Sequence, residues 1–224
     1  MPTAMTFQSL QADLQNYLER GTVQDPIVFA QLPELINFAE RRIATELKLA
    51  GFIVPAVFTM QAGLAVYAKP DRWRKTVSMN VGSSAVGTSV RNQVYPRSYE
   101  YLREYWPDDT QTNTTVYGVP GPPKFYADYN YQNFIVAPTP DAAYPAELVY
   151  YEQPALLDNT NNTNWITQYQ PNLLLYAALL ECSPFLKKDE RIATWQAMYD
   201  RIAAVVNEQD TDKIIDRSTT RQAD

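Results

Sequence analysis

Apolar residues recur at helical spacing in two segments near the start of the chain. The first predicted helix begins after Thr6, a residue suited to cap a helix, and ends at Gly21. The second is predicted to begin near Pro33, because proline is favoured in a first turn, and to end at Gly51. Glu40 and its charged neighbours are expected on the polar side of the second helix. The apolar stripes consist of Phe7, Leu10, Leu14, Tyr17 and Leu18, then Leu35, Ile36, Ala39, Ile43 and Leu47.

Two further helices are predicted near the C-terminus. The third opens at Pro171 and is apolar nearly all round as far as Leu180, so it is expected to be the most buried element. The fourth starts near Asp189, and its inner face is marked by Ile192, Trp195, Tyr199, Ile202 and Val206. The links within each pair of helices are short, and each pair is therefore predicted to form a helical hairpin.

The middle of the chain, from Phe52 to about Gln153, has a different pattern. Short runs of β-branched and aromatic residues alternate there with turn residues, which is typical of strands. Ser98–Tyr105 is expected to be one short helix. The predicted strands are Val54–Thr59, Leu64–Ala68, Lys75–Val81, Thr88–Val94, Lys124–Asp128, Asn133–Ala137 and Glu147–Tyr151.

Together these patterns predict an α+β fold. We expect a four-helix body made of two helical hairpins, a β-rich insertion between them and an extended C-terminal tail. The expected bounds are 1–51 and 165–209 for the helical body, 52–164 for the insertion and 210–224 for the tail. The tail alternates charged residues with Ser and Thr, a composition typical of segments that are disordered on their own.

The residue inventory excludes several kinds of catalytic site. The chain has no His, which removes Ser-His-Asp and Cys-His chemistry and most zinc sites. Its single cysteine, Cys182, ends an apolar run and is expected to be a buried, inert thiol. The seven glycines form no phosphate-binding or dinucleotide-binding loop. We therefore expect no cofactor and no enzymatic activity.

Acidic residues offer the one enzymatic alternative. Glu100 and Glu104 are spaced to share a helix face, and Asp108 and Asp109 follow closely. A glycosidase needs two placed carboxylates, and a cluster of carboxylates can hold a metal ion. Such groups are also common on solvated surfaces, so a catalytic role needs support from geometry.

Charge and aromatic content bear on the partners. A net charge of −6 disfavours general binding of nucleic acid. A basic cluster, Lys69, Arg72, Arg74 and Lys75 around Trp73, either lines a channel, contacts an acidic partner or forms a solvated edge with snorkelling side chains. Arg41 and Arg42 are candidates for an interhelix ion pair or a subunit interface. The tyrosines concentrated between Tyr95 and Tyr169 are expected to bury some of their area against another chain.

No membrane association or secretion is expected from the sequence. No apolar run approaches the ~20 residues that a membrane span needs. The N-terminal residues Met1–Ala4 carry neither the basic region nor the apolar region of a secretion signal. The sequence therefore indicates synthesis and function, or assembly, on the cytosolic side.

Several segments resemble phage head-to-tail adaptor proteins of the tail tubular protein A-like family. Leu32–Ile43 is similar to the early helix of that family. Leu148–Leu156, Trp165 and Leu173–Arg191 are similar to its second half, where a last strand precedes a polar loop, a buried helix, a short break and a long final helix. The hairpin leading into Ala137–Pro140 also fits. The resemblance covers most of residues 5–210 and consists of packing patterns, so it carries no catalytic residue.

The resemblance implies a structural role in the virion, at the head-tail junction, after assembly in the host cytoplasm. Copies of the chain would form a ring, usually a dodecamer, between the portal protein and a tail or nozzle protein. DNA would pass through the channel without sequence-specific binding. The portal-docking residues would be Ile214, Ile215, Asp216, Arg217 and Arg221, and the interface or channel residues Arg41, Arg42, Arg72, Arg74 and Lys75. A tail-associated cell-wall hydrolase, a receptor-binding component and a cytosolic helical scaffold stay open as alternatives.

Overall fold

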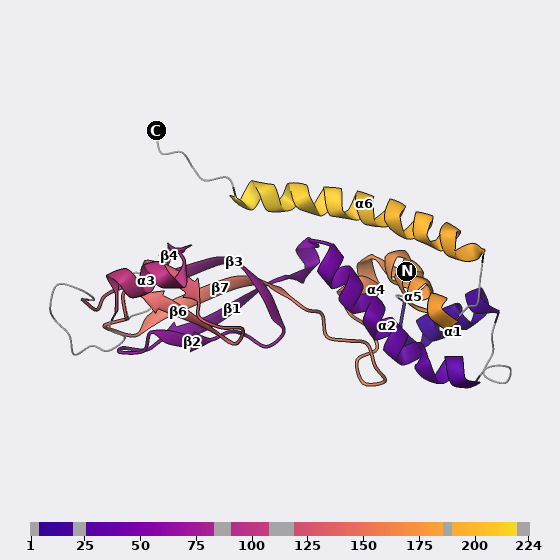
Figure 1. Ribbon diagram of the computed structural model, residues 1–224, viewed down its shortest axis with the longest axis horizontal. Helices are drawn as coiled ribbons and strands as arrows, with labels where there is room; N and C mark the ends of the chain where they lie inside the picture. Colours follow the sequence, from indigo (N-terminus) through magenta and orange to yellow (C-terminus); the bar gives the residue numbers. More distant parts are fainter. Residues whose placement is uncertain (1–4, 20–25, 83–90, 108–118, 186–189, 219–224) are drawn as a thin grey trace. The chain divides into compact units, whose positions relative to one another are not determined.

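A computed structural model describes residues 5–19, 26–82, 91–107, 119–185 and 190–218 (Figure 1). The chain divides into two compact units. The helical unit consists of Met1–Phe52 together with Gln153–Asp224, and the β unit consists of Ile53–Glu152. The two units are described separately below.

The helical unit is built around its most apolar helix. α5 contacts α1, α2, α4 and α6, and its residues from Leu173 to Leu175 and from Ala177 to Leu180 are all buried. Among the described helices α5 has the largest buried share, as predicted, although most of strand β6 in the β unit is buried as well. In the described part of the chain the unit comprises α1 (Phe7–Leu18), α2 (Pro26–Glu46), a 3-10 turn η1 (Ala50–Phe52), α4 (Trp165–Tyr169), α5 (Pro171–Glu181), a second turn η2 (Ser183–Phe185) and α6 (Arg191–Ser218).

The start of the second helix was predicted wrongly. α2 begins at Pro26 and includes Pro33 in its interior. Pro26 occupies the first turn, where backbone N–H groups have no partner within the helix. Proline therefore costs no hydrogen bond there, and Pro26 is the proline that marks the start of α2. Val28 and Leu32 of the added segment are buried. Their burial compensates for the hydrogen bond that an interior proline removes.

The β unit holds a seven-stranded mixed sheet in the order β1-β7-β3-β4-β5-β6-β2. All neighbouring strands are antiparallel except β4 and β5, which are parallel. Met60, Met79 and Leu148 are fully buried on the inner face of the sheet. The elements are β1 (Ile53–Met60), β2 (Val66–Ala68), β3 (Trp73–Gly82), β4 (Arg91–Pro96), α3 (Tyr99–Tyr105), β5 (Phe125–Asp128), β6 (Asn133–Ala137) and β7 (Tyr144–Glu152).

The predicted fold class is wrong in its organisation. Instead of a four-helix body with an insertion, the described residues form six α-helices and a seven-stranded mixed sheet. The five-residue helix α4 was missed because it is too short to show helical periodicity. The prediction of an extended tail over 210–224 is also wrong, because α6 continues to Ser218. A helix that packing has already nucleated gains one hydrogen bond for each residue added, so a polar continuation can stay helical.

Candidate functional site

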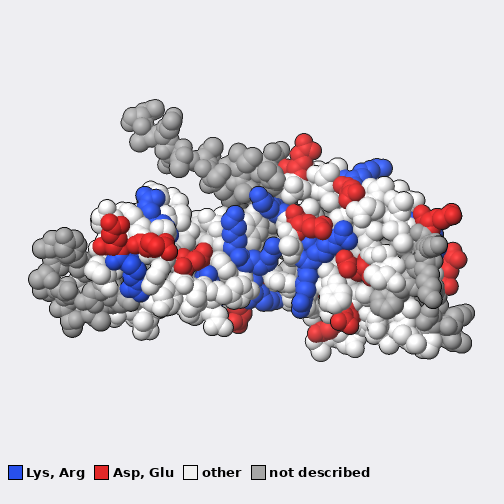
Figure 2. All heavy atoms as spheres, in the orientation of Figure 1, with Lys and Arg blue, Asp and Glu red and all other residues white. Residues whose placement is uncertain are grey.

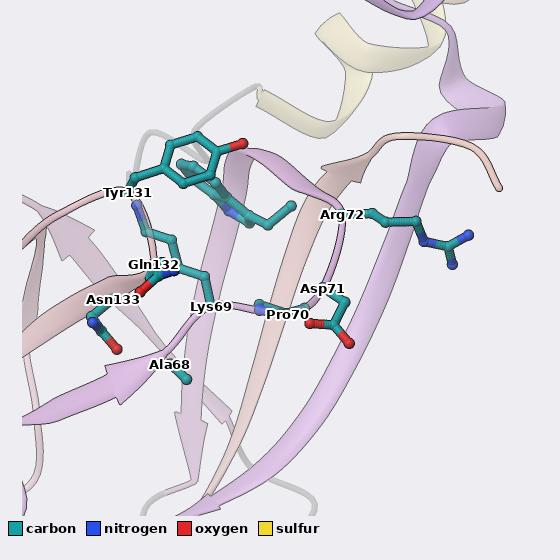
Figure 3. A pocket seen from close by; sticks show the side chains of 9 residues that line it. Ala68, Lys69, Pro70, Asp71, Arg72, Tyr131, Gln132 and Asn133 are labelled. Atoms are coloured by element: carbon teal, nitrogen blue, oxygen red, sulfur yellow. The ribbon is translucent and has the colours of Figure 1, made fainter. Parts of the chain in front are cut away.

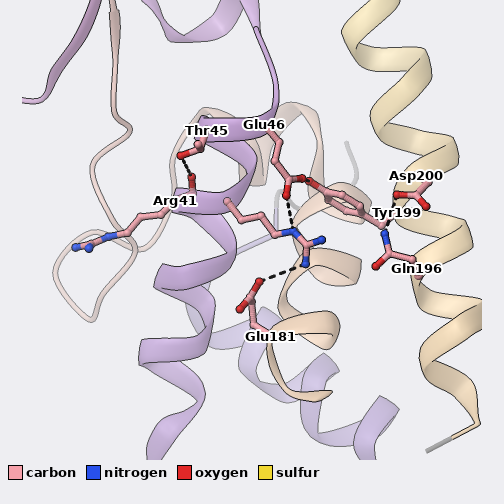
Figure 4. Close-up of polar contacts among 8 residues, drawn as sticks. Arg41, Thr45, Glu46, Glu181, Gln196, Tyr199 and Asp200 are labelled. Atoms are coloured by element: carbon pink, nitrogen blue, oxygen red, sulfur yellow. Dashed lines mark hydrogen bonds and ion pairs between the residues drawn. The ribbon is translucent and has the colours of Figure 1, made fainter. Parts of the chain in front are cut away.

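Arg42 joins three helices of the helical unit (Figure 4). Its Nε donates to Glu46 Oε1 on α2 at 2.9 Å, and its Nη1 donates to Glu181 Oε1 on α5 at 3.3 Å. Its guanidinium carbon lies 5.0 Å from the centre of the Tyr199 ring on α6. The Tyr199 hydroxyl donates to Glu46 Oε2 at 2.6 Å. Burial and this hydrogen bond raise the pKa of Tyr199, so the hydroxyl remains a donor at neutral pH.

Replacing Tyr199 with phenylalanine is expected to lower the free energy of unfolding by about 0.5–1.5 kcal/mol, the usual net value of a hydrogen bond. The loss stays small because the Glu46 side chain is 43% exposed and water can replace the hydroxyl. Urea unfolding followed by circular dichroism measures it. Tyr169→Phe is the matched control, since the Tyr169 hydroxyl bonds to no described residue. Equal midpoints for the two variants would contradict the role of the network.

Arg41 is oriented differently from Arg42. Its side chain is exposed and points away from Glu181 and Tyr199 (Figure 4). Its backbone oxygen accepts a hydrogen bond from the Thr45 hydroxyl at 2.7 Å, and its guanidinium has no ion-pair partner among the described residues. Of the two candidate arginines, Arg42 is thus held by its own chain and Arg41 is presented to the surroundings.

The basic residues at the start of β3 also differ in whether contacts within the chain hold their side chains. Arg72, in a turn with a φ of 58°, pairs with Glu152 of β7 at 2.8 Å. Arg74 is half-buried, and burial lowers its pKa below the ordinary value. Lys75 is exposed. The side chains of Arg74 and Lys75 form no hydrogen bond or ion pair with any residue that the structure describes, so both charges are suited to pair with other groups.

Acidic and basic side chains both reach the face of the molecule that Figure 2 shows. The net charge of −6 therefore does not produce a surface of one sign. Surfaces that present both signs can complement another copy of the same chain, because an acidic patch on one copy can meet a basic patch on the next.

Lys69, like Arg72, is held by contacts within its own chain. Its side chain is only 4% exposed, and its Nζ lies 2.8 Å from Asp128 Oδ1. The same nitrogen donates to the backbone oxygen of Asn130 at 2.9 Å and lies 3.7 Å from the centre of the Trp73 ring. Through this ion pair and hydrogen bond, Lys69 stabilises the turn between β5 and β6. For this residue the interpretation as a snorkelling, solvated side chain is wrong.

A cavity of about 370 Å³ opens beside this lysine (Figure 3). Tyr131 of the β5–β6 turn and Arg72 of the β2–β3 turn lie on opposite sides of it. Tyr131 is 81% exposed, which is unusual for a side chain with so large an apolar area. The lining residues are Ala68, Lys69, Pro70, Asp71, Arg72, Trp73, Tyr131, Gln132 and Asn133.

Other aromatic side chains surround α3. Tyr101 packs 4.7 Å from Tyr105 and 6.0 Å from Phe125, measured between ring centres. Arg97 lies over both Tyr101 and Phe125. Tyr95, Tyr105 and Tyr129 are exposed as well. Tyrosine and arginine are among the residue types most enriched at the centres of protein interfaces.

The predicted portal-docking residues lie at the end of the described chain. Ile214, Ile215, Asp216 and Arg217 belong to the helical backbone of α6, but their side chains are outside the described part, and Arg221 lies outside the described residues altogether. The described buried residues of α6 are Trp195, Tyr199, Ala203 and Val206. At the same spacing the sequence continues with Asp210, Lys213 and Arg217.

The described residues give no geometric support to the enzymatic alternative. Glu100 and Glu104 are exposed on α3, and neither lines the cavity of Figure 3. Asp108 and Asp109 lie outside the described residues. In the described ranges no three carboxylate or thiol side chains cluster so as to hold a metal ion. Cys182 is buried, and burial raises the pKa of its thiol to about 12.

Glu40 lies in the core of the helical unit and not on the polar side of its helix, where its charge predicted it. It is fully buried and accepts a hydrogen bond from the Leu157 N–H at 2.9 Å and another from Asn164 Nδ2. Burial raises its pKa to about 7, although both hydrogen bonds favour the ionised form. The available signal was its spacing, four residues after Ile36 and three before Ile43, within the apolar stripe.

No helix in the described part of the chain has the length and hydropathy needed to cross a membrane. A family model described as SU10 adaptor protein matches residues 5–223, which include nearly all of both units. No curated protein matches the chain.

Proposed function

Because the chain belongs to the SU10 adaptor protein family, a family of phage head-to-tail adaptors, we propose that its copies close a ring between the capsid portal and the tail. Proteins of this family are structural components of the virion and interact with portal and tail proteins. The observation that carries the proposal is the extent of the match, which spans residues 5–223.

Three cations that no described residue pairs with support a ring of this kind. In a closed ring each copy meets the next through two different surfaces. Arg41, Arg74 and Lys75 have no acidic partner among the described residues, so they are suited to pair with acidic residues of a neighbouring copy. Those that face the central channel instead would lie beside the DNA and leave it free to move, since they would contact phosphates and not bases.

The C-terminal part of α6 is the proposed portal-binding element. α6 has 28 residues, which corresponds to about 42 Å of helix. Its described buried residues end at Val206, so the last turns are not needed for the described core of the helical unit. Ile214 and Ile215 are the only apolar pair in this stretch. Such a pair would anchor a helix in an apolar groove of the portal.

Deleting Asp212–Asp224 is expected to leave a folded protein with unchanged ring formation and at least tenfold weaker binding to purified portal. The fold should survive because the deletion removes no residue of the described core. Co-sedimentation with portal measures binding, and electron microscopy shows whether a ring stacks on the portal. Ile214→Ala with Ile215→Ala should reproduce most of the loss, whereas Thr219→Ala with Thr220→Ala is the matched control. Undiminished binding of the truncated chain would refute the docking role.

A further inference from the structure

We propose that the free edge of strand β1 pairs, backbone to backbone, with an extended segment of a second copy of this chain. The inference rests on the proposed ring and assigns part of its subunit contact to the β unit. It is carried by the position of β1 in the sheet, the direction of its backbone groups and the residues exposed along it.

β1 is the end strand of the sheet. It pairs with β7 over its full length, from Ile53 opposite Tyr151 to Met60 opposite Tyr144. On its other side no strand of the described chain pairs with it. An end strand presents a row of N–H and C=O groups that can bind another strand. At eight residues, β1 offers a longer free edge than the three-residue strand β2 at the other end of the sheet.

Pro55 shows which backbone groups face this edge. Proline has no N–H, so within a sheet it is tolerated where its nitrogen points away from the paired strand. Backbone groups alternate in direction along a strand, and Val57 and Thr59 therefore also direct their N–H and C=O groups to the free edge. Residues Val54, Ala56 and Phe58 then supply the groups that pair with β7.

The exposed residues give this edge no charge protection. Natural edge strands are usually guarded by lysines or other charges. Ile53–Met60 contains no charged residue, and the outward side chains are Pro55, Val57 and Thr59. Val57 is 67% exposed, whereas Val54, Ala56 and Phe58 pack inward on the core. Pro55 guards one position of this edge, whereas Val57 and Thr59 keep N–H groups there that can pair with another strand.

A second copy fits this edge better than another protein does. An apolar surface without charges is typical of permanent contacts, such as those within a homo-oligomer. Pairing of β1 with β1 would be symmetric and would close at a dimer. The neighbour must therefore supply a different segment, as a ring requires.

Val57→Pro tests the inference, because it removes an N–H at the free edge and leaves the bonds to β7 intact. Val57→Thr is the matched control, since it keeps the N–H and the β-branched shape. Val57→Lys is the second variant, which blocks the edge by charge without altering the backbone. Circular dichroism and thermal unfolding verify the fold. Native mass spectrometry and electron microscopy measure the oligomer, alone and on the portal.

Wild-type protein and Val57→Thr are expected to form rings, while folded Val57→Pro and Val57→Lys dissociate at concentrations at least tenfold higher than the control. Rings of unchanged stability in both blocked variants would overturn the inference and leave the proposed function standing. Rings that persist but lose binding to the tail protein would assign the edge to the tail and overturn pairing between copies. A wild-type chain that forms no ring, even on the portal, would contradict the proposed function itself.

Discussion

Replacing Glu40 with alanine is expected to lower the free energy of unfolding of the helical unit by about 2–4 kcal/mol, in the range for breaking a buried hydrogen-bonded group. Two donors lose their acceptor, the Leu157 N–H and Asn164 Nδ2. Asn164 also caps α4, where its side chain accepts from the Thr167 N–H. The substitution therefore loosens the segment before α4 in addition to leaving buried polar groups unpaired.

The ionisation of Glu40 gives the same prediction a pH dependence. Its pKa is about 7 in the folded chain and near the model-peptide value of 4.5 when unfolded. Between these values the folded chain binds more protons than the unfolded chain, so this group stabilises at low pH and its contribution is lost as the pH rises through about 7. The difference corresponds to about 3 kcal/mol. In Glu40→Gln this dependence should disappear.

Urea unfolding at about pH 5 and about pH 8, followed by circular dichroism, measures both effects. Glu34→Ala is the matched control, because Glu34 is exposed on the same helix and the change there should stay within about 0.5 kcal/mol. Two results would contradict the argument: a Glu40→Ala variant as stable as the control, or a Glu40→Gln variant that loses stability with pH as steeply as the wild type.

The strands and the N-cap of α1 could be predicted from the sequence, because the residues that determine them are neighbours in the chain. Alternation of β-branched and aromatic residues located the seven strands that the structure describes, with ends displaced by a few residues, and the predicted start at Thr88 lies outside the described residues. Thr6 was correctly expected to cap α1, and it forms a reciprocal pair of hydrogen bonds with Ser9. Each of these patterns depends on residues that are neighbours in the chain, so a single sequence contains the whole signal.

The errors concern residues whose environment is made by distant parts of the chain. Glu40 accepts its hydrogen bond from a residue 117 positions away. The Lys69 side chain is covered by a turn about 60 positions further on, where the backbone oxygen of Asn130 accepts a hydrogen bond from its Nζ. A charged residue is polar in any sequence pattern, and only the tertiary contact shows that it is buried. The same holds for the candidate site: spacing grouped Lys69 with Arg72, Arg74 and Lys75, whereas contacts separate them.

Gly51 is needed for a reason other than the predicted end of a helix. It was expected to end the second helix, but α2 ends at Glu46 and Gly51 lies in the turn η1. A Cβ placed on Gly51 would lie 2.0 Å from Trp165 Cε2. Trp165 cannot easily move, because its ring packs against Phe52 at 5.6 Å and Tyr169 at 5.5 Å between centres. Space for the indole ring explains the glycine.

Gly51→Ala is therefore expected to lower the free energy of unfolding by about 1–3 kcal/mol, the usual cost of overpacking. Gly121→Ala is the matched control, since a Cβ there meets nothing within 4 Å and the change should stay within about 0.5 kcal/mol. Adding Trp165→Leu should make Gly51→Ala nearly neutral, because the two sites are in contact and their effects do not add. Thermal unfolding measures Gly51→Ala, Gly121→Ala, Trp165→Leu alone and the double variant. If Gly51→Ala cost equally with and without Trp165, backbone conformation and not the indole ring would be the reason for glycine at this position.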